Sequence, residues 1–264
     1  MSSKVVAIIQ ARMGSKRLPG KMMLDLAGQP VLKVVVDRVR AAKRVNQVIV
    51  ATSLASADVA IERLCLKERI DCYRGSENDV LDRVYQAALN NHANYIVDIT
   101  GDCPLVDPRH IDKIIDDLLG TSRSLSSRNR QAYEGAPDYA ANCWVREWPD
   151  GLDIQVYTMD ALEKVWKSPA SIREHVGWNI PQHADEFQFN IRQTCAPKRY
   201  EHPEWGLTLD EEKDYKLLKM LFAEAVLAYG DHLFPVEVVL EYLLKRPEHL
   251  RTNADVVRKI PGKG

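Results

Sequence analysis

Residues 5–21 read VVAIIQARMGSKRLPGK, and pass from a short apolar run directly into a loop of small and basic residues. The run at residues 5–9 is continuous and β-branched, which is typical of a strand buried on both faces of a mostly parallel sheet. Gly14 and Ser15 allow the backbone to approach a ligand closely. The loop carries four cations, Arg12, Lys16, Arg17 and Lys21. Such a loop suits a polyphosphate, although its spacing fits a basic surface turn equally well.

The segments that follow alternate between strand and helix patterns. We expect further strands at residues 47–51, 72–74 and 95–100, and helices at residues 31–42, 56–67, 80–91 and 108–119. This alternation predicts an α/β fold with a doubly wound, mostly parallel, Rossmann-like sheet. Ligands of such sheets gather at the carboxyl ends of the strands, where both the basic loop and Asp102 fall. The two motifs are therefore expected to face one cleft.

The second half of the chain has shorter and more mixed elements. We expect strands at residues 139–145, 152–157 and 187–194, and helices at residues 159–167, 171–178, 211–229 and 235–245. The polar stretch 120–137 fits either a solvated surface loop or a flap over a substrate. The basic tail 258–264 is expected to be frayed. We predict a single domain over residues 1–264, with a nucleotide-binding half at 1–119 and a smaller mixed α/β elaboration at 120–264.

The composition is that of a soluble globular protein. The chain has 264 residues, 45% of them hydrophobic and 28% charged, and a formal net charge of -1, so nothing global indicates binding to nucleic acid or to an anionic membrane. No apolar run reaches the length of a membrane span, and a cytoplasmic location is the default expectation. Five scattered cysteines without a C-x-x-C pair argue against a disulfide framework or a zinc site. Any metal should therefore be a hard cation held by oxygen.

Asp102 is the first candidate for such a ligand. It follows the expected strand at residues 95–100 in the sequence Gly-Asp-Cys-Pro, where a carboxylate either binds a cation or caps a turn. Cys103 has no neighbouring base in the sequence, and we interpret it as a packing or pocket-lining residue.

Residues 11–21 contain neither a Walker A sequence nor a G-x-G-x-x-G fingerprint. They do contain every fixed element of the pattern A-R-x-x-S-x-R-L-P-G-K. In this the chain resembles the cytidylyltransferases that activate acidic sugars, the CMP-Kdo and CMP-sialate synthetases, and above all the branch of spore-coat polysaccharide cytidylyltransferases. The resemblance implies a GT-A-type nucleotidyltransferase fold, CTP and a sugar as substrates, Mg²⁺ as cofactor, and a homodimer whose contact comes from the second half.

The resemblance also implies roles for residues of the opening loop and for two carboxylates. Arg12, Arg17 and Lys21 would hold the triphosphate and act with Asp102 in catalysis. The further nucleotide-binding candidates in the loop are Ala11, Gly14, Ser15 and Lys16. Asp102, in the family's Gly-Asp-x-Pro pattern, would bind Mg²⁺, which needs a second carboxylate. Asp210 matches the family's late strand-to-helix junction, although it is equally well placed as a helix N-cap.

Three later segments match the family more weakly. Asp82 and Arg83 correspond to a region near the cytidine and ribose, but by themselves they read as ordinary helix surface. Asp153 is a charge within a strand-like run and is a candidate for sugar or metal contacts; this branch typically shows G-L-D-x-E, and Gln155 replaces the glutamate. Arg173 and His175 lie in a matching segment, where the histidine would orient the sugar or assist its ionisation, or serve only as hydrogen-bonded structure.

The sequence therefore predicts a magnesium-dependent cytidylyltransferase that transfers CMP from CTP to an acidic or related sugar for surface-polysaccharide synthesis, with release of pyrophosphate. Two alternatives stay open. One is a related enzyme on the same fold, a sugar-phosphate nucleotidylyltransferase or a nucleotide-sugar glycosyltransferase. The other is a non-catalytic nucleotide-binding protein.

Overall fold

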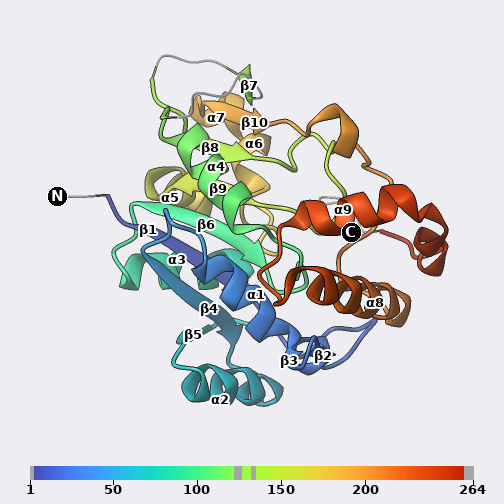
Figure 1. Ribbon diagram of the computed structural model, residues 1–264. Helices are drawn as coiled ribbons and strands as arrows, with labels where there is room; N and C mark the ends of the chain where they lie inside the picture. The colour runs from blue at the N-terminus through green and yellow to red at the C-terminus, as the bar shows by residue number, and fades with distance from the viewer. Residues whose placement is uncertain (1–2, 122–126, 132–134, 259–264) are drawn as a thin grey trace.

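The computed structural model describes residues 3–121, 127–131 and 135–258. Its main feature is an eight-stranded sheet with the order β5-β4-β1-β6-β9-β8-β10-β7 (Figure 1). The loop expected at residues 120–137 and the tail expected at 258–264 lie in part outside the described residues.

The first half of the chain forms the parallel side of this sheet. Its strands are β1 (Val5–Gln10), β4 (Gln47–Ser53), β5 (Asp71–Gly75) and β6 (Tyr95–Thr100). β1 lies between β4 and β6, and β5 pairs with the far edge of β4; all these pairings are parallel. The α/β fold with a mostly parallel sheet is confirmed. The carboxyl ends of β1 and β6, residues 10 and 100, are direct partners in the register.

The second half extends the same sheet with mixed strand directions. The added strands are β9 (Gln155–Thr158), β8 (Tyr139–Ala141), β10 (Ile191–Thr194) and β7 (Ser127–Gln131). β9 is antiparallel to β6 and to β8, β10 is parallel to β8, and β7 is antiparallel to β10. The mixed elaboration is thus continuous with the parallel sheet.

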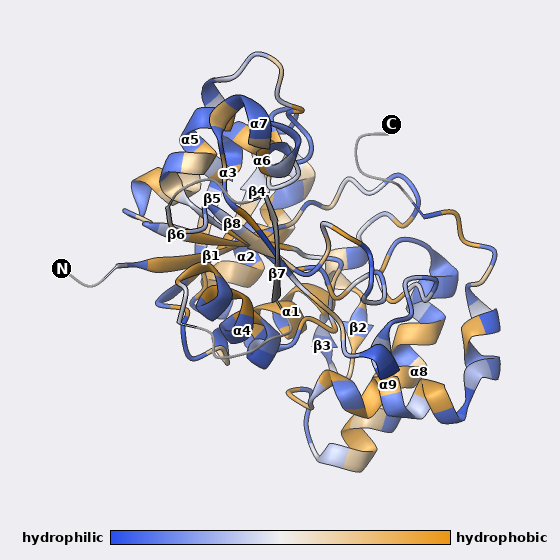
Figure 2. Ribbon diagram, turned by 90° about the horizontal axis from the view of Figure 1, so that it is seen from above, coloured by the Kyte–Doolittle hydropathy of each residue, from blue (hydrophilic) through white to orange (hydrophobic). Residues whose placement is uncertain are grey.

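Helices cover both faces of the sheet, as Figure 2 shows. On one side α1 (Val31–Arg40) and α4 (Pro108–Leu118) lie together, and on the other α3 (Val80–Asn90) and α5 (Met159–Lys167). α2 (Val59–Lys67) packs in the same apolar cluster as α1 and α4. Successive residues of a strand point to opposite faces of the sheet, so a single strand packs side chains against the helices on both faces.

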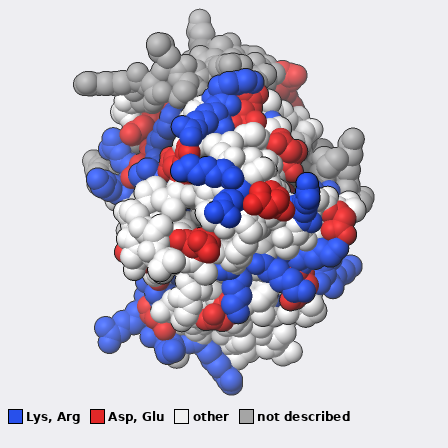
Figure 3. Space-filling view, turned by 45° about the vertical axis from the view of Figure 1, so that its right-hand side comes forward, with Lys and Arg blue, Asp and Glu red and all other residues white. Residues whose placement is uncertain are grey.

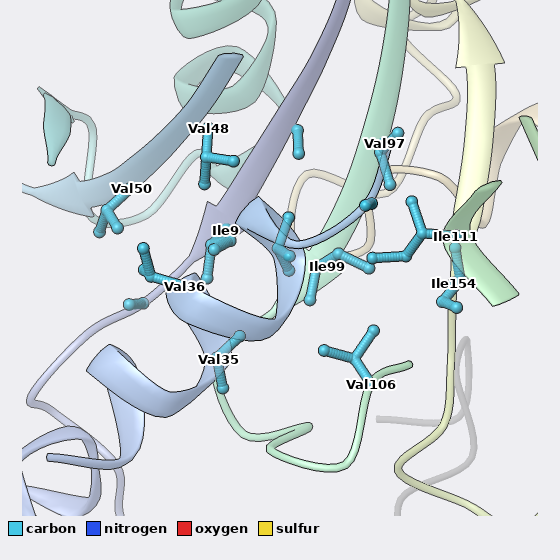
Figure 4. Close-up of a cluster of buried hydrophobic side chains, with 14 of the residues drawn as sticks. Ile9, Val35, Val36, Val48, Val50, Val97, Ile99, Val106, Ile111 and Ile154 are labelled. Carbon is cyan, nitrogen blue, oxygen red and sulfur yellow. The ribbon is translucent and has the colours of Figure 1, made fainter. Parts of the chain in front are cut away.

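Figure 4 shows the core between the sheet and its α1 and α4 face. Ile9 of β1 and Ile99 of β6 lie among side chains of the helices, including Val35 and Ile111, and each of these four is fully buried. The neighbouring residue Ile8 belongs to the opposite cluster, which contains α3 and α5. The continuous apolar runs of β1 and β6 therefore follow from burial on both faces.

A third apolar cluster lies beside the sheet and contains the C-terminal helices α8 (Glu212–Tyr229) and α9 (Val236–Lys245). Figure 1 shows both next to α1 and the small hairpin of β2 (Asp25–Leu26) and β3 (Gln29–Pro30). Short 3-10 helices lie at Lys21–Met23, Ser56–Asp58, Lys198–Tyr200 and Pro247–Thr252. No helix within residues 3–121, 127–131 and 135–258 is both long and apolar enough to cross a bilayer. The face drawn in Figure 3 carries Lys and Arg interspersed with Asp and Glu.

Several expected elements of the second half are wrong in kind or extent. The strand expected at 139–145 is only β8, which ends at Ala141, and the strand expected at 152–157 begins only at Gln155, with β9. Residues 171–178 form turns, and the helix there is the short α6 (Asn179–Gln182). The side chain of Asn179 accepts from Ile172 N at 2.7 Å and donates to His175 O at 2.7 Å, so it satisfies backbone groups that a helix would have paired. The strand expected at 187–194 is only β10, because α7 (Ala184–Phe187) precedes it and Gln188 adopts a left-handed conformation with φ 57°.

The side chain of Arg38 joins the first half to the C-terminal helices. It is fully buried in α1, and its Nε donates to Val106 O at 2.7 Å. Its Nη1 donates to His232 O and Phe234 O, at 2.7 and 3.0 Å, in the connection between α8 and α9. The guanidinium also lies 4.8 Å from the centre of the Phe234 ring.

Replacing Arg38 by Met should lower the free energy of unfolding by about 3 kcal/mol, because three carbonyl groups, two of them buried, lose their donor. Arg40→Met is the matched control, since Arg40 is exposed and donates only to Arg69 O among the described residues. Urea denaturation of both variants measures the difference. Equal stability of the two variants would show that Arg38 does not join the two halves.

Candidate active site

The loop after β1 is anchored to the end of β4. Ala11 N donates to Ala51 O at 3.2 Å, and Met13 N donates to Asp58 Oδ1 at 2.7 Å. Asp58 is buried and also accepts from Ser53, so its carboxylate holds the loop in place. The sequence reasoning did not single out Asp58. In the loop Gly14 and Lys16 are exposed and Ser15 is half-buried, which leaves this part of the backbone accessible to a ligand.

The end of β6 packs tightly against this loop at Gly101. Gly101 N donates to Gln10 O at 2.8 Å. A Cβ at this position would lie 3.0 Å from Gln10 O and 2.9 Å from Met22 Sδ. Only glycine fits here without a shift of the backbone or of Met22. This close approach places the next residue, Asp102, beside the basic loop.

Lys21 is the residue on which the cluster converges. Its Nζ lies 2.7 Å from Asp102 Oδ2 and 3.4 Å from Asp210 Oδ1, and it donates to Leu209 O at 2.7 Å. Leu209 N donates to Asp102 O at 2.8 Å, so the strand end of β6 and the segment before α8 are also joined through their backbones. The structure thus brings together the three candidates Lys21, Asp102 and Asp210, which come from distant parts of the chain.

Arg17 pairs with the other side of Asp210. Its Nη2 lies 2.8 Å from Asp210 Oδ2, and its Nη1 donates to Val257 O at 3.0 Å. The N-cap of α8 is Glu211, which forms a capping box with Asp214. The alternative of Asp210 as the N-cap is therefore wrong, and its carboxylate interacts with the two cations instead.

The pairing sets the charge of both central groups. Burial would raise the pKa of Asp102, but the adjacent Lys21 ammonium outweighs it and holds that pKa below its ordinary value. Burial would likewise lower the pKa of Lys21, but the two carboxylates raise it above its ordinary value. Both groups are charged at neutral pH. By contrast, burial raises the pKa of the Cys103 thiol, which agrees with its interpretation as a packing residue.

The two carboxylates suit a hard cation. Asp102 and Asp210 already converge on one positive charge, the Lys21 ammonium, and carboxylate oxygens are the ligands that Mg²⁺ prefers. Within the described parts of the chain, no group of three or more His, Cys, Asp or Glu side chains is arranged to hold a metal. A metal bound here would therefore complete its coordination with phosphate oxygens and water.

Arg12, Asp82 and Arg83 lie outside this cluster. The Arg12 side chain is 46% exposed and lies 3.8 Å from Glu174. Arg83 is buried and its Nη1 donates to Ser76 O at 2.6 Å, while Asp82 Oδ1 accepts from Trp166 Nε1 at 3.0 Å. The contacts of Asp82 and Arg83 within the described residues are thus contacts that stabilise the fold around α3.

A cavity of about 430 Å³ lies beside the carboxyl ends of β1 and β6. It is lined by Gln10, Asp98, Thr100, Cys143, Trp144, Arg146, Asp150, Asp153, Gln155, Glu174, His175, Val176, Trp178, Pro203 and Arg258. Three of the predicted substrate residues, Asp153, Gln155 and His175, are therefore at one cavity. Arg173 is not among the lining residues, because it turns to Asp79 and pairs with its carboxylate at 2.7 Å.

The sequence reasoning missed several residues of this cavity. Asp98 is buried in β6, where it accepts from Gln10 Nε2 at 2.5 Å and from Tyr157 OH at 3.0 Å. A carboxylate inside an otherwise apolar strand was a signal available in the sequence. Arg146 and Arg258 come from loops and gave no such signal, because only the fold brings them to the end of the sheet.

This combination defines a class of protein. An α/β sheet with a basic loop after its first strand, two carboxylates converging on one cation and an adjacent polar cavity is a nucleotidyltransferase site. The chain matches the cytidylyltransferase family over residues 6–237 and belongs to it. It is a CTP-dependent cytidylyltransferase, which confirms the predicted family and enzyme class over the glycosyltransferase and non-catalytic alternatives.

Relatives and a solved structure agree with this assignment. The chain is 30% identical over 228 residues to the spore coat polysaccharide biosynthesis protein SpsF of Bacillus subtilis, which covers 84% of this chain and 87% of that protein. It is 38% identical over 119 residues to a 3-deoxy-manno-octulosonate cytidylyltransferase of Anaeromyxobacter, and this match covers 44% of this chain and 48% of that protein. A cytidylyltransferase structure from Leptospira borgpetersenii superposes with a TM-score of 0.79 at 27% identity, covering 98% of this chain and 99% of that one.

Removing the Lys21 cation should destabilise the protein in a pH-dependent way. Lys21 lowers the pKa of Asp102. At pH values above the ordinary Asp pKa of about 3.9, the free energy of unfolding of the wild type should therefore exceed that of Lys21→Met. This difference should shrink as the pH falls through the lowered pKa of Asp102. Urea denaturation from neutral to acidic pH measures it. Lys198→Met, whose side chain is 92% exposed, is the control and should show little difference at any pH. A Lys21 effect that grows on acidification would contradict this pairing.

Proposed function

We propose that this enzyme transfers CMP from CTP to a hydroxyl group of an acidic or related sugar, in the synthesis of a surface polysaccharide. One observation carries the proposal: the Lys21, Asp102 and Asp210 cluster and the polar cavity share the carboxyl ends of β1 and β6. Gln10 and Thr100 line the cavity, and the basic loop and Asp102 follow them directly in the chain. The relatives that act in spore coat polysaccharide synthesis and on 3-deoxy-manno-octulosonate support a sugar acceptor.

We assign the binding of the CTP triphosphate to the basic loop after β1. Arg12, Arg17 and Lys21 neutralise the triphosphate, and the exposed backbone at Gly14 offers an N–H donor. Asp102 and Asp210 would hold Mg²⁺, which would neutralise the charge that develops on the departing pyrophosphate. Lys21 and Arg17 already neutralise these two carboxylates. The charged side chains of the cluster are therefore held in place before CTP binds.

We assign the binding of the cytidine of CTP to residues of the basic loop and of the start of α3. Ala11 and Lys16 belong to the loop itself, and Asp82 and Arg83 follow from the resemblance. The side chain of Arg83 is held in place by its bond to Ser76 O. A homodimer stays a prediction of the resemblance, and a cytoplasmic location stays the default expectation from the sequence.

The cavity is assigned to the acceptor. Asp153, Gln155 and His175 line it and offer hydrogen bonds to sugar hydroxyl groups, while Trp144 and Trp178 supply an aromatic wall with ring centres 4.8 Å apart. Arg173 acts indirectly here, because its pair with Asp79 fixes the segment that carries His175.

The test of the reaction is pyrophosphate release with Mg²⁺, with each of the four nucleoside triphosphates offered against a panel of acidic and neutral sugars. We expect CTP with one sugar to react. Asp102→Asn and Asp210→Asn should each lower kcat at least about 100-fold, because the metal loses half of its protein ligands. Asp255→Asn, an exposed carboxylate paired with Lys213, is the control. A different preferred triphosphate, or full activity of both site variants, would contradict the proposal.

Trp178→Ala should raise KM for the sugar about 10-fold and leave the Kd for CTP unchanged, because the tryptophan wall belongs to the cavity and not to the phosphate loop. Calorimetry with CTP and steady-state kinetics with the sugar separate the two effects. The cavity would not be the acceptor site if CTP binding weakened and KM for the sugar stayed the same.

A further inference from the structure

The four carboxylates that line the cavity differ in how they are held. Asp98 accepts a hydrogen bond on each oxygen, from Gln10 and from Tyr157. Asp153 is bound on both oxygens by the Arg146 guanidinium, at 2.8 Å from Nη2 to Oδ2 and by a second contact from Nη1. Each oxygen of these two carboxylates therefore already accepts a hydrogen bond from the protein.

Asp150 is held differently. Its nearest cation is Arg146, whose Nη2 lies 3.6 Å from Asp150 Oδ1, beyond hydrogen-bond distance. No hydrogen bond to this carboxylate is formed by any residue that the structure describes. Its side chain is only 24% exposed, whereas the side chain of Glu174 is 57% exposed and faces solvent. Asp150 is thus the sheltered carboxylate of the cavity that has free acceptor capacity.

Backbone hydrogen bonds fix Asp150 beside the segment that leads to the Lys21, Asp102 and Asp210 cluster. Asp150 N donates to Trp205 O at 2.9 Å, and Leu207 N donates to Asp150 O at 2.6 Å. The next residue, Gly151, has φ 104°, and a Cβ there would lie 2.4 Å from Leu207 C, so only glycine allows this approach. The segment that holds Asp150 continues to Leu209, which bonds to Asp102 O. Asp150 is therefore positioned by the same segment that carries Asp210.

We propose that Asp150 is the general base that takes the proton from the acceptor hydroxyl group; this rests on the proposed function. The hydroxyl oxygen forms a bond to the α-phosphorus of CTP, and the bond from that phosphorus to the pyrophosphate oxygen breaks. The hydroxyl proton passes to the Asp150 carboxylate and from there to solvent, while pyrophosphate leaves with the electron pair. No other co-reactant is required.

The charges around Asp150 suit this role. Burial, followed by the neighbouring Asp153, raises the pKa of Asp150 to about 6, and Asp210 adds to this effect. Arg146 and Arg258 oppose it. A base with a pKa near 6 is mostly ionised at neutral pH and yet binds a proton more strongly than an ordinary carboxylate.

The test compares the wild type with Asp150→Asn, Asp150→Glu and Asp98→Asn, using CTP, Mg²⁺ and the sugar that releases pyrophosphate fastest. Asp150→Asn should lower kcat at least about 100-fold with an unchanged Kd for CTP, and Asp150→Glu should restore part of the loss. The acidic limb of the wild-type profile of kcat/KM against pH, with a midpoint near 6, should vanish in Asp150→Asn and persist in Asp98→Asn. A limb that vanishes only in Asp98→Asn, or full activity of Asp150→Asn, would overturn the assignment.

A second measurement does not depend on the acceptor. Burial also raises the pKa of Asp98 to about 6, so NMR with ¹³C-labelled aspartate should show two carboxyl resonances that titrate near 6. Asp150→Asn should remove one of them and Asp98→Asn the other. If the resonance lost in Asp150→Asn instead titrates near the ordinary value of about 4, Asp150 is not the base. A wild type that binds CTP but uses no sugar contradicts the proposed function, whereas a titration of Asp150 near the ordinary value overturns only the assignment of the base.

Discussion

The ammonium group of Lys21 is the interaction on which this site depends. It bonds to Asp102 at the end of β6, to Leu209 O before α8, and lies 3.4 Å from Asp210. Two carboxylates brought this close would repel each other in a partly buried corner, so a cation must lie between them. Lys21 supplies that cation in the free protein, and it comes from the loop that is assigned to the triphosphate. The site is consequently preassembled around balanced charges.

The second half of the chain contributes residues to the site itself. β9 extends the parallel sheet beyond β6, and residues 205–209 run alongside both Asp150 and Asp102. The cavity is therefore bounded on one side by strands of the first half and on the other by β9 and loops of the second half. Two close glycine contacts, at Gly101 and Gly151, bring these parts together. A polar pocket beside a phosphate-binding corner is the arrangement that transfer between a nucleotide and a second substrate requires.

The first half of the fold was predictable, because its strands are continuous apolar runs buried on both faces and its helices carry clear apolar stripes. The prediction was weaker beyond residue 120. The turns at residues 171–178 are held by the Asn179 side chain, and such local bonding between side chain and backbone has no helical or strand period to reveal it. Likewise Arg173 resembled a substrate residue, but its partner Asp79 lies in a segment far away in the sequence.

The sequence by itself determined the chemical elements of the site: the basic loop after the first strand, the aspartate after the fourth parallel strand, and the family to which the chain belongs. These are local patterns, and local patterns follow from residue type and spacing. Only the tertiary structure decided which charges meet. Lys21 lies 81 and 189 positions from Asp102 and Asp210, and Asp150 differs from Asp98 and Asp153 only in the partners that surround it. Burial and pairing set the reactivity of a carboxylate, and both are properties of the folded chain.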